Sequence, residues 1–99
     1  MSRIIELISK GTELKADLKL ENIRKISEWL TEVQLYAELK YKGLSFTKSL
    51  VTNIDSFNAS ALSYQVISED VFDMILGSVE GIKNYEENNS LEDALSKMK

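Results

Sequence analysis

Apolar residues recur along most of this chain at intervals of three and four positions. The cleanest run lies within residues 22–41, where apolar residues share one side of a helix and charged residues share the other. Its apolar members are Ile23, Ile26, Trp29, Leu30, Val33, Tyr36, Ala37 and Tyr41. This pattern predicts an amphipathic helix over residues 23–42, with one face turned to a hydrophobic core.

The same period predicts further helices, which cover residues 3–19, 45–65, 69–87 and 91–98. The chain has no proline and only four glycines, so few residues are available to break helices or to form tight strand turns. Short connections make successive helices antiparallel neighbours. We therefore predict an all-α fold, an antiparallel four-helix bundle with a short C-terminal fifth helix, in a single domain over residues 1–99.

Polar residues and one glycine mark the expected helix ends. Asn22, Ser45 and Ser68 are placed to cap three of the helices at their N-termini. Gly43 suits the left-handed conformation that often follows a helix C-terminus. The fifth helix is expected after a polar break and a capping-box pattern, formed by Asn88, Asn89, Ser90 and Asp93.

Two local features allow two structures each. Residues 45–65 keep a helical period but are rich in Ser, Thr and Asn, so the pattern favours one continuous helix and leaves a break near residues 53–58 open. Gly11 falls inside the first helix. Its missing side chain indicates either a close approach by another helix or a kink, and close packing is the favoured interpretation.

Leu35 and Leu39 are candidate interface residues. A helical wheel places them opposite Ile23 and Leu30, on the side that carries Glu28. A second packing surface is therefore needed to bury these two side chains. Either the C-terminal half of this helix is sandwiched within the bundle, or the two leucines form an exposed patch for a partner or a second copy.

The other candidate interface residues each have a structural and a functional interpretation. Trp29 and Tyr36 lie at the edge of the apolar stripe, where packing is favoured over an aromatic platform for a ligand. Gly77 and Gly81 form a small-residue seam, for which packing inside the bundle is favoured over a dimer contact. Leu95, in the short fifth helix, docks on the bundle or on a second subunit.

The composition argues against several kinds of chemistry. The chain contains no cysteine and no histidine, which removes the thiolate nucleophile, the commonest general base and the usual transition-metal ligands. Acidic pairs such as Glu69 and Asp70 lie near helix ends and lack calcium-loop spacing. We expect no catalytic residues, no cofactor and no metal site, and therefore a protein that is not an enzyme.

The charge distribution bears on partners and location. Residues 1–50 carry nine Lys and Arg against seven Asp and Glu, and residues 51–99 carry three against nine. A chain without a basic cluster does not fit nucleic acid as a partner. The apolar run at the N-terminus is interrupted by Glu6 and Lys10, so we expect no signal peptide, no membrane span and a cytoplasmic protein.

The order of residues in the first half resembles a known group of segments. The sequence IIELISKGTEL at 4–14, then Trp29, Val33 and Tyr36, then YKGLSFTKSL at 41–50, is similar to small helical segments of phage, prophage and abortive-infection-type proteins of Gram-positive bacteria. The resemblance covers about residues 3–50. Because those segments have no catalytic signature and no effector domain follows here, it implies a stand-alone interaction module.

These observations favour a non-enzymatic protein-binding module, phage-related or defence-related, that presents an apolar helix patch with acidic surroundings. Its partner would be another protein or a second copy of the chain. Size and the expected four-helix bundle also resemble small bacteriocin immunity proteins, which implies an immunity function as the alternative. A structural homodimer is a further alternative.

Overall fold

The computed structural model describes the backbone of residues 3–97 and the side chains of residues 3–88. Within that part the chain is all-helical and has no strand, which confirms the predicted fold class. It contains four α-helices and one short 3-10 turn, namely α1 Arg3–Lys15, η1 Leu20–Asn22, α2 Ile23–Tyr41, α3 Ser45–Tyr64 and α4 Glu69–Lys97.

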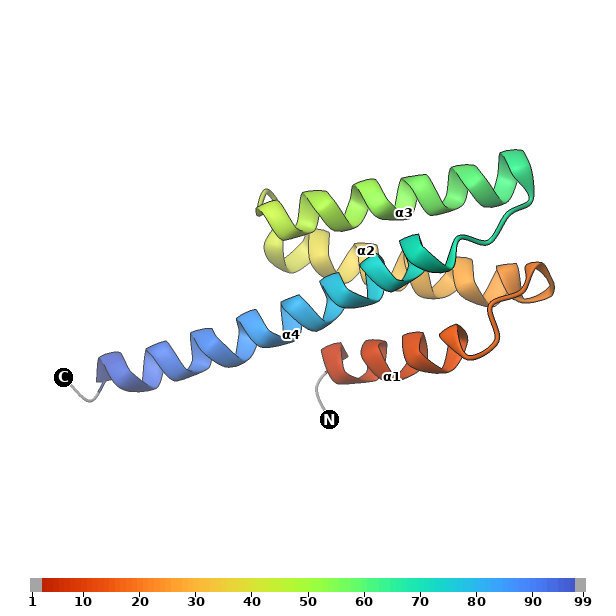
Figure 1. Ribbon diagram of the computed structural model, residues 1–99. Coiled ribbons are helices and arrows are strands. Elements are labelled where there is room, and N and C mark those ends of the chain that lie inside the picture. The colour runs from red at the N-terminus through yellow and green to blue at the C-terminus, as the bar shows by residue number, and fades with distance from the viewer. Residues whose placement is uncertain (1–2, 98–99) are drawn as a thin grey trace.

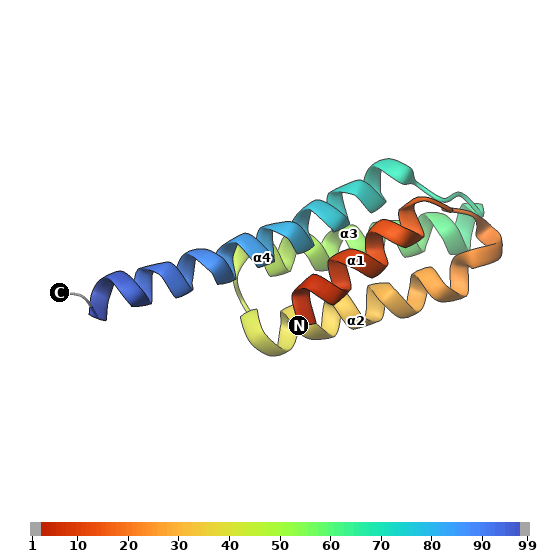
Figure 2. The ribbon, with the colours of Figure 1, turned by 90° about the horizontal axis from the view of Figure 1, so that it is seen from below.

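The four α-helices run alternately up and down and pack around one core (Figure 1). Each helix contacts the helix that follows it, and α4 returns to contact α1, so the bundle closes as a ring of four. Helix α4 is the longest and continues past the end of the bundle at which α2 and α3 are joined (Figure 1, Figure 2). The molecule is accordingly elongated, with extents of 55 × 25 × 20 Å.

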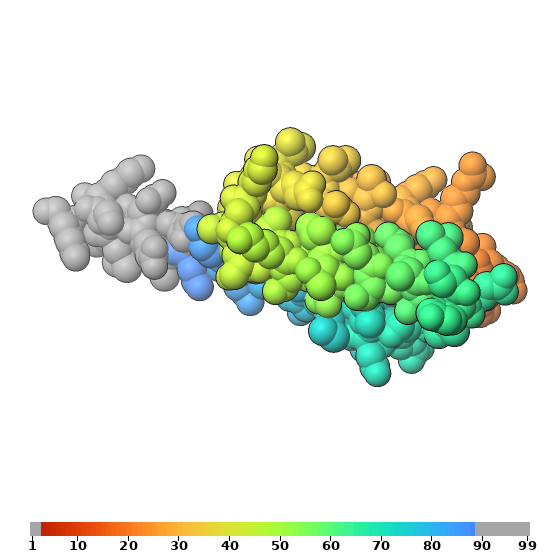
Figure 3. Space-filling view, turned by 90° about the horizontal axis from the view of Figure 1, so that it is seen from above, coloured from red at the N-terminus to blue at the C-terminus, as the bar shows by residue number. Residues whose placement is uncertain are grey.

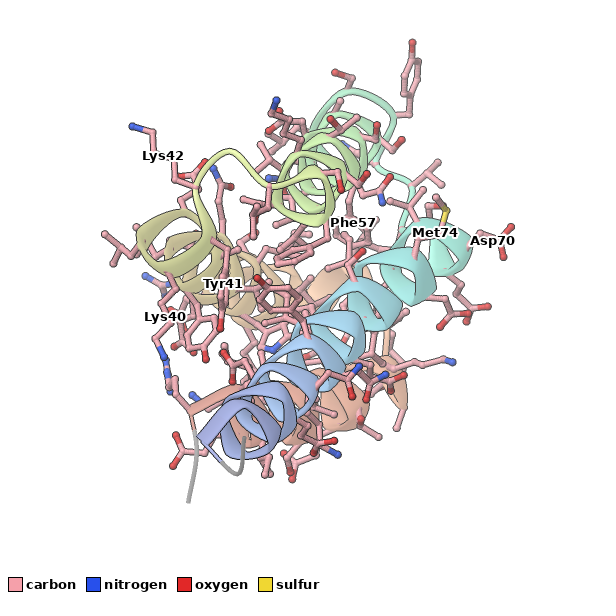
Figure 4. All side chains as sticks on the ribbon, turned by 90° about the vertical axis from the view of Figure 1, so that its left-hand side faces the viewer. Lys40, Tyr41, Lys42, Phe57, Asp70 and Met74 are labelled. Atoms are coloured by element: carbon pink, nitrogen blue, oxygen red, sulfur yellow. The ribbon has the colours of Figure 1, made fainter. Side chains whose placement is uncertain are left out.

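The core is formed where the apolar faces of the four helices meet. Its centre holds aromatic residues from three helices: the ring centroids of Trp29 and Phe57 lie 5.1 Å and 6.0 Å, respectively, from that of Phe72. A view along the bundle shows Phe57 pointing between the helices (Figure 4). The fully buried aliphatic side chains around these rings are Leu7, Ile26, Leu30, Val33, Leu50, Ile54, Ile75, Val79 and Ile82.

Gly11 allows α1 and α2 to approach closely, as the favoured interpretation predicted. A Cβ atom there would overlap Cζ2 of Trp29 and would lie 2.8 Å from Cδ1 of Leu76. The indole N–H of Trp29 donates a buried 2.8 Å hydrogen bond to the carbonyl of Leu7, one turn before Gly11. The large side chain of α2 therefore fills the space that the glycine leaves, and α1 runs without a break.

The helix ends confirm two of the predicted signals. Gly43 follows α2 with a φ of 87°, in the left-handed region. The hydroxyl of Ser68 accepts a 3.3 Å hydrogen bond from the backbone N–H of Val71 and so caps α4.

Of the other two predicted caps, Asn22 holds the N-cap position but makes no capping hydrogen bond, and the prediction of Ser45 is wrong. Asn22 donates its side-chain amide to the carbonyl of Asp17 at 2.9 Å instead of capping α2. This bond helps to hold the turn that follows α1. Helix α1 ends at Lys15, not near residue 19 as predicted. Leu44 occupies the N-cap position of α3, and Ser45 is already helical.

Of the two C-terminal helices, α3 was predicted with the correct extent and α4 was not. Residues 45–64 form one continuous helix, the favoured interpretation. The separate fifth helix expected over residues 91–98 is not shown, because α4 continues without a break from Glu69 to Lys97. Asn and Ser each lower helix propensity by only about 0.5 kcal/mol relative to Ala, too little to end a helix that packing has already formed. No Gly or Pro occurs after Gly81 to stop it.

Candidate functional site

A groove lies between the C-terminal half of α2 and the N-terminal half of α3. It has a volume of about 640 Å³, and we call it the α2–α3 groove. Its apolar lining residues are Leu35, Leu39 and Val51, and its charged ones are Glu38, Lys42 and Lys48. The space-filling view shows this face of the molecule, on which α2 (orange to yellow) and α3 (green) lie side by side (Figure 3).

The two candidate leucines of α2 form the exposed wall of this groove. Leu39 is 82% exposed and Leu35 is 53% exposed, so neither is sandwiched within the bundle. The reason is topological. Helix α2 packs against α1 and α3, its neighbours in the ring, through its buried face. Leu35 and Leu39 lie outside that face, at its edge toward α3. Of the two arrangements left open by the sequence, the structure therefore has the exposed patch.

The connection between α2 and α3 fixes the shape of the groove. The chain turns at Gly43, and the N–H of Leu44 donates to the carbonyl of Tyr41 at 3.2 Å. Thr47, a buried residue in the first turn of α3, donates its hydroxyl to the same carbonyl at 2.8 Å. Both groove walls are thus tied to the end of α2, and the groove is formed before any partner binds.

An aromatic cluster on the opposite side of α2 anchors α4. The hydroxyls of Tyr36 and Tyr41 each donate a 2.5 Å hydrogen bond to the same carboxylate oxygen of Glu86, in α4. The ring of Tyr41 also packs against Tyr85 and Phe46, with centroids 5.5 Å apart in both pairs. These contacts fix the point from which α4 leaves the bundle.

Burial is the main cause of a raised tyrosine pKa in this cluster, and the Glu86 carboxylate adds to it. Together they raise the pKa of Tyr41 to about 12 from its ordinary value of 10.0. The same two causes, in the same order, raise the pKa of Tyr36. Both hydroxyls therefore remain protonated donors at neutral pH, as the hydrogen bonds to Glu86 require.

Three of the other predicted interface residues lie away from the groove. Trp29 is buried in the core, 2% exposed, so the packing interpretation is correct and it offers no platform for a ligand. The prediction that Gly77 and Gly81 pack inside the bundle is wrong, because both are exposed and a Cβ atom at either would meet nothing within 4 Å. Leu95 lies outside the residues whose side chains the structure describes.

Sequence reasoning missed the second wall of the groove. Val51 lies off the apolar stripe of α3, next to Leu50, and an apolar residue on a polar helix face was the available signal.

The expected acidic surroundings are wrong for the rim of the groove, where Lys42 and Lys48 lie with Glu38. Figure 4 shows Lys42 pointing outward from the end of α2. The rim is therefore net basic, although the whole chain is acidic.

A second hollow, of about 370 Å³, lies between α1 and α2 and is lined largely by charged residues. Carboxylate and ammonium groups both line it, and Lys10 pairs with Glu32 at 3.4 Å. Among the described residues, no group of three or more potential metal ligands comes together here or elsewhere. The hollow therefore has neither the apolar surface of the α2–α3 groove nor a charge of one sign.

Comparisons of the chain with protein-family models, with curated proteins and with solved structures find no match. Over the part of the chain that the structure describes, no helix combines the length and the hydropathy needed to cross a membrane. Function is therefore inferred from the residues of the α2–α3 groove.

Proposed function

We propose that this chain is a non-enzymatic protein-binding module whose α2–α3 groove receives the apolar face of a helix. The observation that carries the proposal is the exposure of Leu39, 82%, at the edge of a groove that also contains Leu35 and Val51. Burial of a leucine side chain contributes about 1.5–3 kcal/mol. Further burial of these three side chains by a partner would therefore favour binding, most of all at Leu39, the most exposed of them.

The shape and charge of the groove support a helical ligand. A groove between two antiparallel helices suits a third helix that inserts apolar residues at i, i+3 or i+4, and i+7. Lys42 and Lys48 on the rim would pair with acidic residues on the flanks of that helix. The preferred ligand is therefore an amphipathic helix with apolar anchors and acidic flanks.

The resemblance of residues 3–50 to phage and abortive-infection segments adds the biological part of the proposal. A binding module of phage or defence origin acts by occupying a surface of another protein, and it needs no catalytic group. Helix α2 and the start of α3 carry both the resemblance and the groove.

A displayed library of helical peptides tests the proposal. Peptides are selected on the native chain and then measured against Leu39→Glu and against Leu62→Glu. Leu62 is the matched control, since it is 81% exposed and lies near the other end of α3. We expect acidic amphipathic helices to be enriched and to lose about tenfold or more in affinity only with Leu39→Glu. The selection is carried out at a protein concentration at which light scattering gives a monomer, so that the groove is open. Failure to enrich any helix, or equal loss in both variants, would then refute the groove as a binding site.

A further inference from the structure

The C-terminal end of α4 leaves the bundle as an isolated helix. Glu86 still contacts Tyr36 and Tyr41 of α2. Beyond it the α4 backbone continues as a helix to Lys97, and both ribbon views show that stretch clear of the other three helices (Figure 1, Figure 2). We call residues 88–97 the C-terminal segment. A single helix of this length gains little stability alone in water, so it calls for a packing partner.

The sequence of the C-terminal segment matches the ligand expected for the groove. At helical spacing, Leu91, Ala94 and Leu95 fall on one side, as i, i+3 and i+4. Glu92 lies at the edge of that stripe, and Asp93 lies on the opposite, polar side of the helix. The segment is therefore amphipathic and acidic, whereas the rim of the α2–α3 groove carries Lys42 and Lys48.

The segment also fits the groove in length and in position. Ten helical residues span about 15 Å, and the stretch of α2 from Leu35 to Tyr41 spans about 10 Å. The C-terminal segment projects from the same end of the bundle at which the groove lies (Figure 1). It cannot reach the groove of its own chain, because it points away from the bundle as a continuation of α4 and the groove lies across the bundle, between α2 and α3 (Figure 4).

We infer that the C-terminal segment of one copy of this chain occupies the α2–α3 groove of a second copy, and that the second copy does the same in return. The inference rests on the proposed function of the groove and names its occupant. A two-fold axis makes the contact twice, so each copy covers both its exposed leucines and its isolated helix. The anchors are Leu91 and Leu95 against Leu35, Leu39 and Val51, and Glu92 flanks them near Lys42 and Lys48.

Cross-linking between two different variants of the full-length chain tests this arrangement. Because the native sequence has no cysteine, Leu39→Cys and Leu95→Cys each introduce a single thiol. The two variants, one of them isotope-labelled, are mixed with oxidised glutathione, and mass spectrometry counts the mixed disulfide. We expect about tenfold more of it than from Leu62→Cys mixed with Leu95→Cys, because docking raises the effective concentration of only the first pair. Equal yields would overturn the inference.

Charge reversal adds a second, independent measurement. Light scattering should give the mass of a dimer for the native chain and of a folded monomer for Lys48→Glu. Combining Lys48→Glu with Glu92→Lys should restore the dimer, because the two charges are exchanged across the interface. A dimer that dissociates with Lys48→Glu but is not restored by Glu92→Lys would place another segment in the groove and overturn the inference.

The two proposals fail in different ways. If the native chain is a monomer and its groove still binds peptides from the library, the inference that a second copy occupies the groove is overturned. The proposed function then stands, with an acidic helix of a different protein as the ligand. A groove that binds no peptide and gives no specific cross-link overturns both. Circular dichroism of every variant checks folding, and the exposed positions of Leu39 and Lys48 predict helical spectra unchanged from the native chain.

Discussion

Replacing Gly11 by alanine should destabilise the bundle, although the same change stabilises most helices. The new Cβ atom would overlap Cζ2 of Trp29 and crowd Cδ1 of Leu76. Trp29 has little room to move, because its indole N–H is bonded to the carbonyl of Leu7 and its ring lies 5.1 Å from that of Phe72. The strain therefore falls on the contact between α1 and α2.

The magnitude follows from three opposing effects. Overpacking a core costs about 1–3 kcal/mol, and alanine in place of glycine returns about 1 kcal/mol of helix propensity. If Trp29 moves far enough to lose its hydrogen bond, the unsatisfied buried N–H costs about 1–3 kcal/mol more. The net loss in the free energy of unfolding is therefore up to about 2 kcal/mol if the hydrogen bond survives and about 1–5 kcal/mol if it is lost. Each kcal/mol lowers the Tm of a domain this small by about 4–8 °C.

Urea denaturation followed by circular dichroism measures the effect, with all variants at one protein concentration so that self-association contributes equally. Gly77→Ala and Gly81→Ala are matched controls within α4. A Cβ atom at either site meets open space, so each should stabilise the chain by up to about 1 kcal/mol. A Gly11→Ala chain as stable as these two variants would refute the packing of Trp29 against Gly11.

Two further predictions concern the cluster around Glu86 and the turn after α2. The pKa of Tyr41 is raised in the folded state to about 12 from 10.0, so its contribution to stability is complete below pH 10 and is lost as pH rises toward 12. Glu86→Gln should lower the midpoint of tyrosine ionisation, measured by ultraviolet absorbance. An unchanged midpoint would contradict the hydrogen bonds. Gly43→Ala should cost about 1–2 kcal/mol, because an L-residue is strained at a φ of 87° although space is open there, and thermal melts that match the native chain would show that the turn relaxes.

The bundle itself could be predicted because its signals are redundant. The core stripe of α2 repeats over five turns, so single exceptions such as Leu35 and Leu39 do not obscure it. Caps were harder. Asn22 has a competing acceptor in the Asp17 carbonyl, five residues earlier in the same turn. A residue type that suits an N-cap suits such a turn as well, so the sequence alone does not distinguish the two.

The site was half readable from the sequence. The offset of Leu35 and Leu39 from the core stripe identified one wall of the groove, but the other wall, Val51, depends on which side of α3 packs next to α2. The placement of Gly77 and Gly81 was available and was missed: the apolar arc centred on Ile75 and Val79 leaves both glycines on the opposite side of the helical wheel.

The hydrogen bond between Trp29 and Leu7 gives the chain a built-in optical reporter. Trp29 is the only tryptophan, and its indole is enclosed by α1 and α4 as well as by its own helix. If α1 detached while the other helices stayed packed, the indole would meet water and its emission would shift to longer wavelength before the helical signal was lost. Fluorescence of the native chain therefore follows the docking of α1, which has thirteen residues, separately from global unfolding.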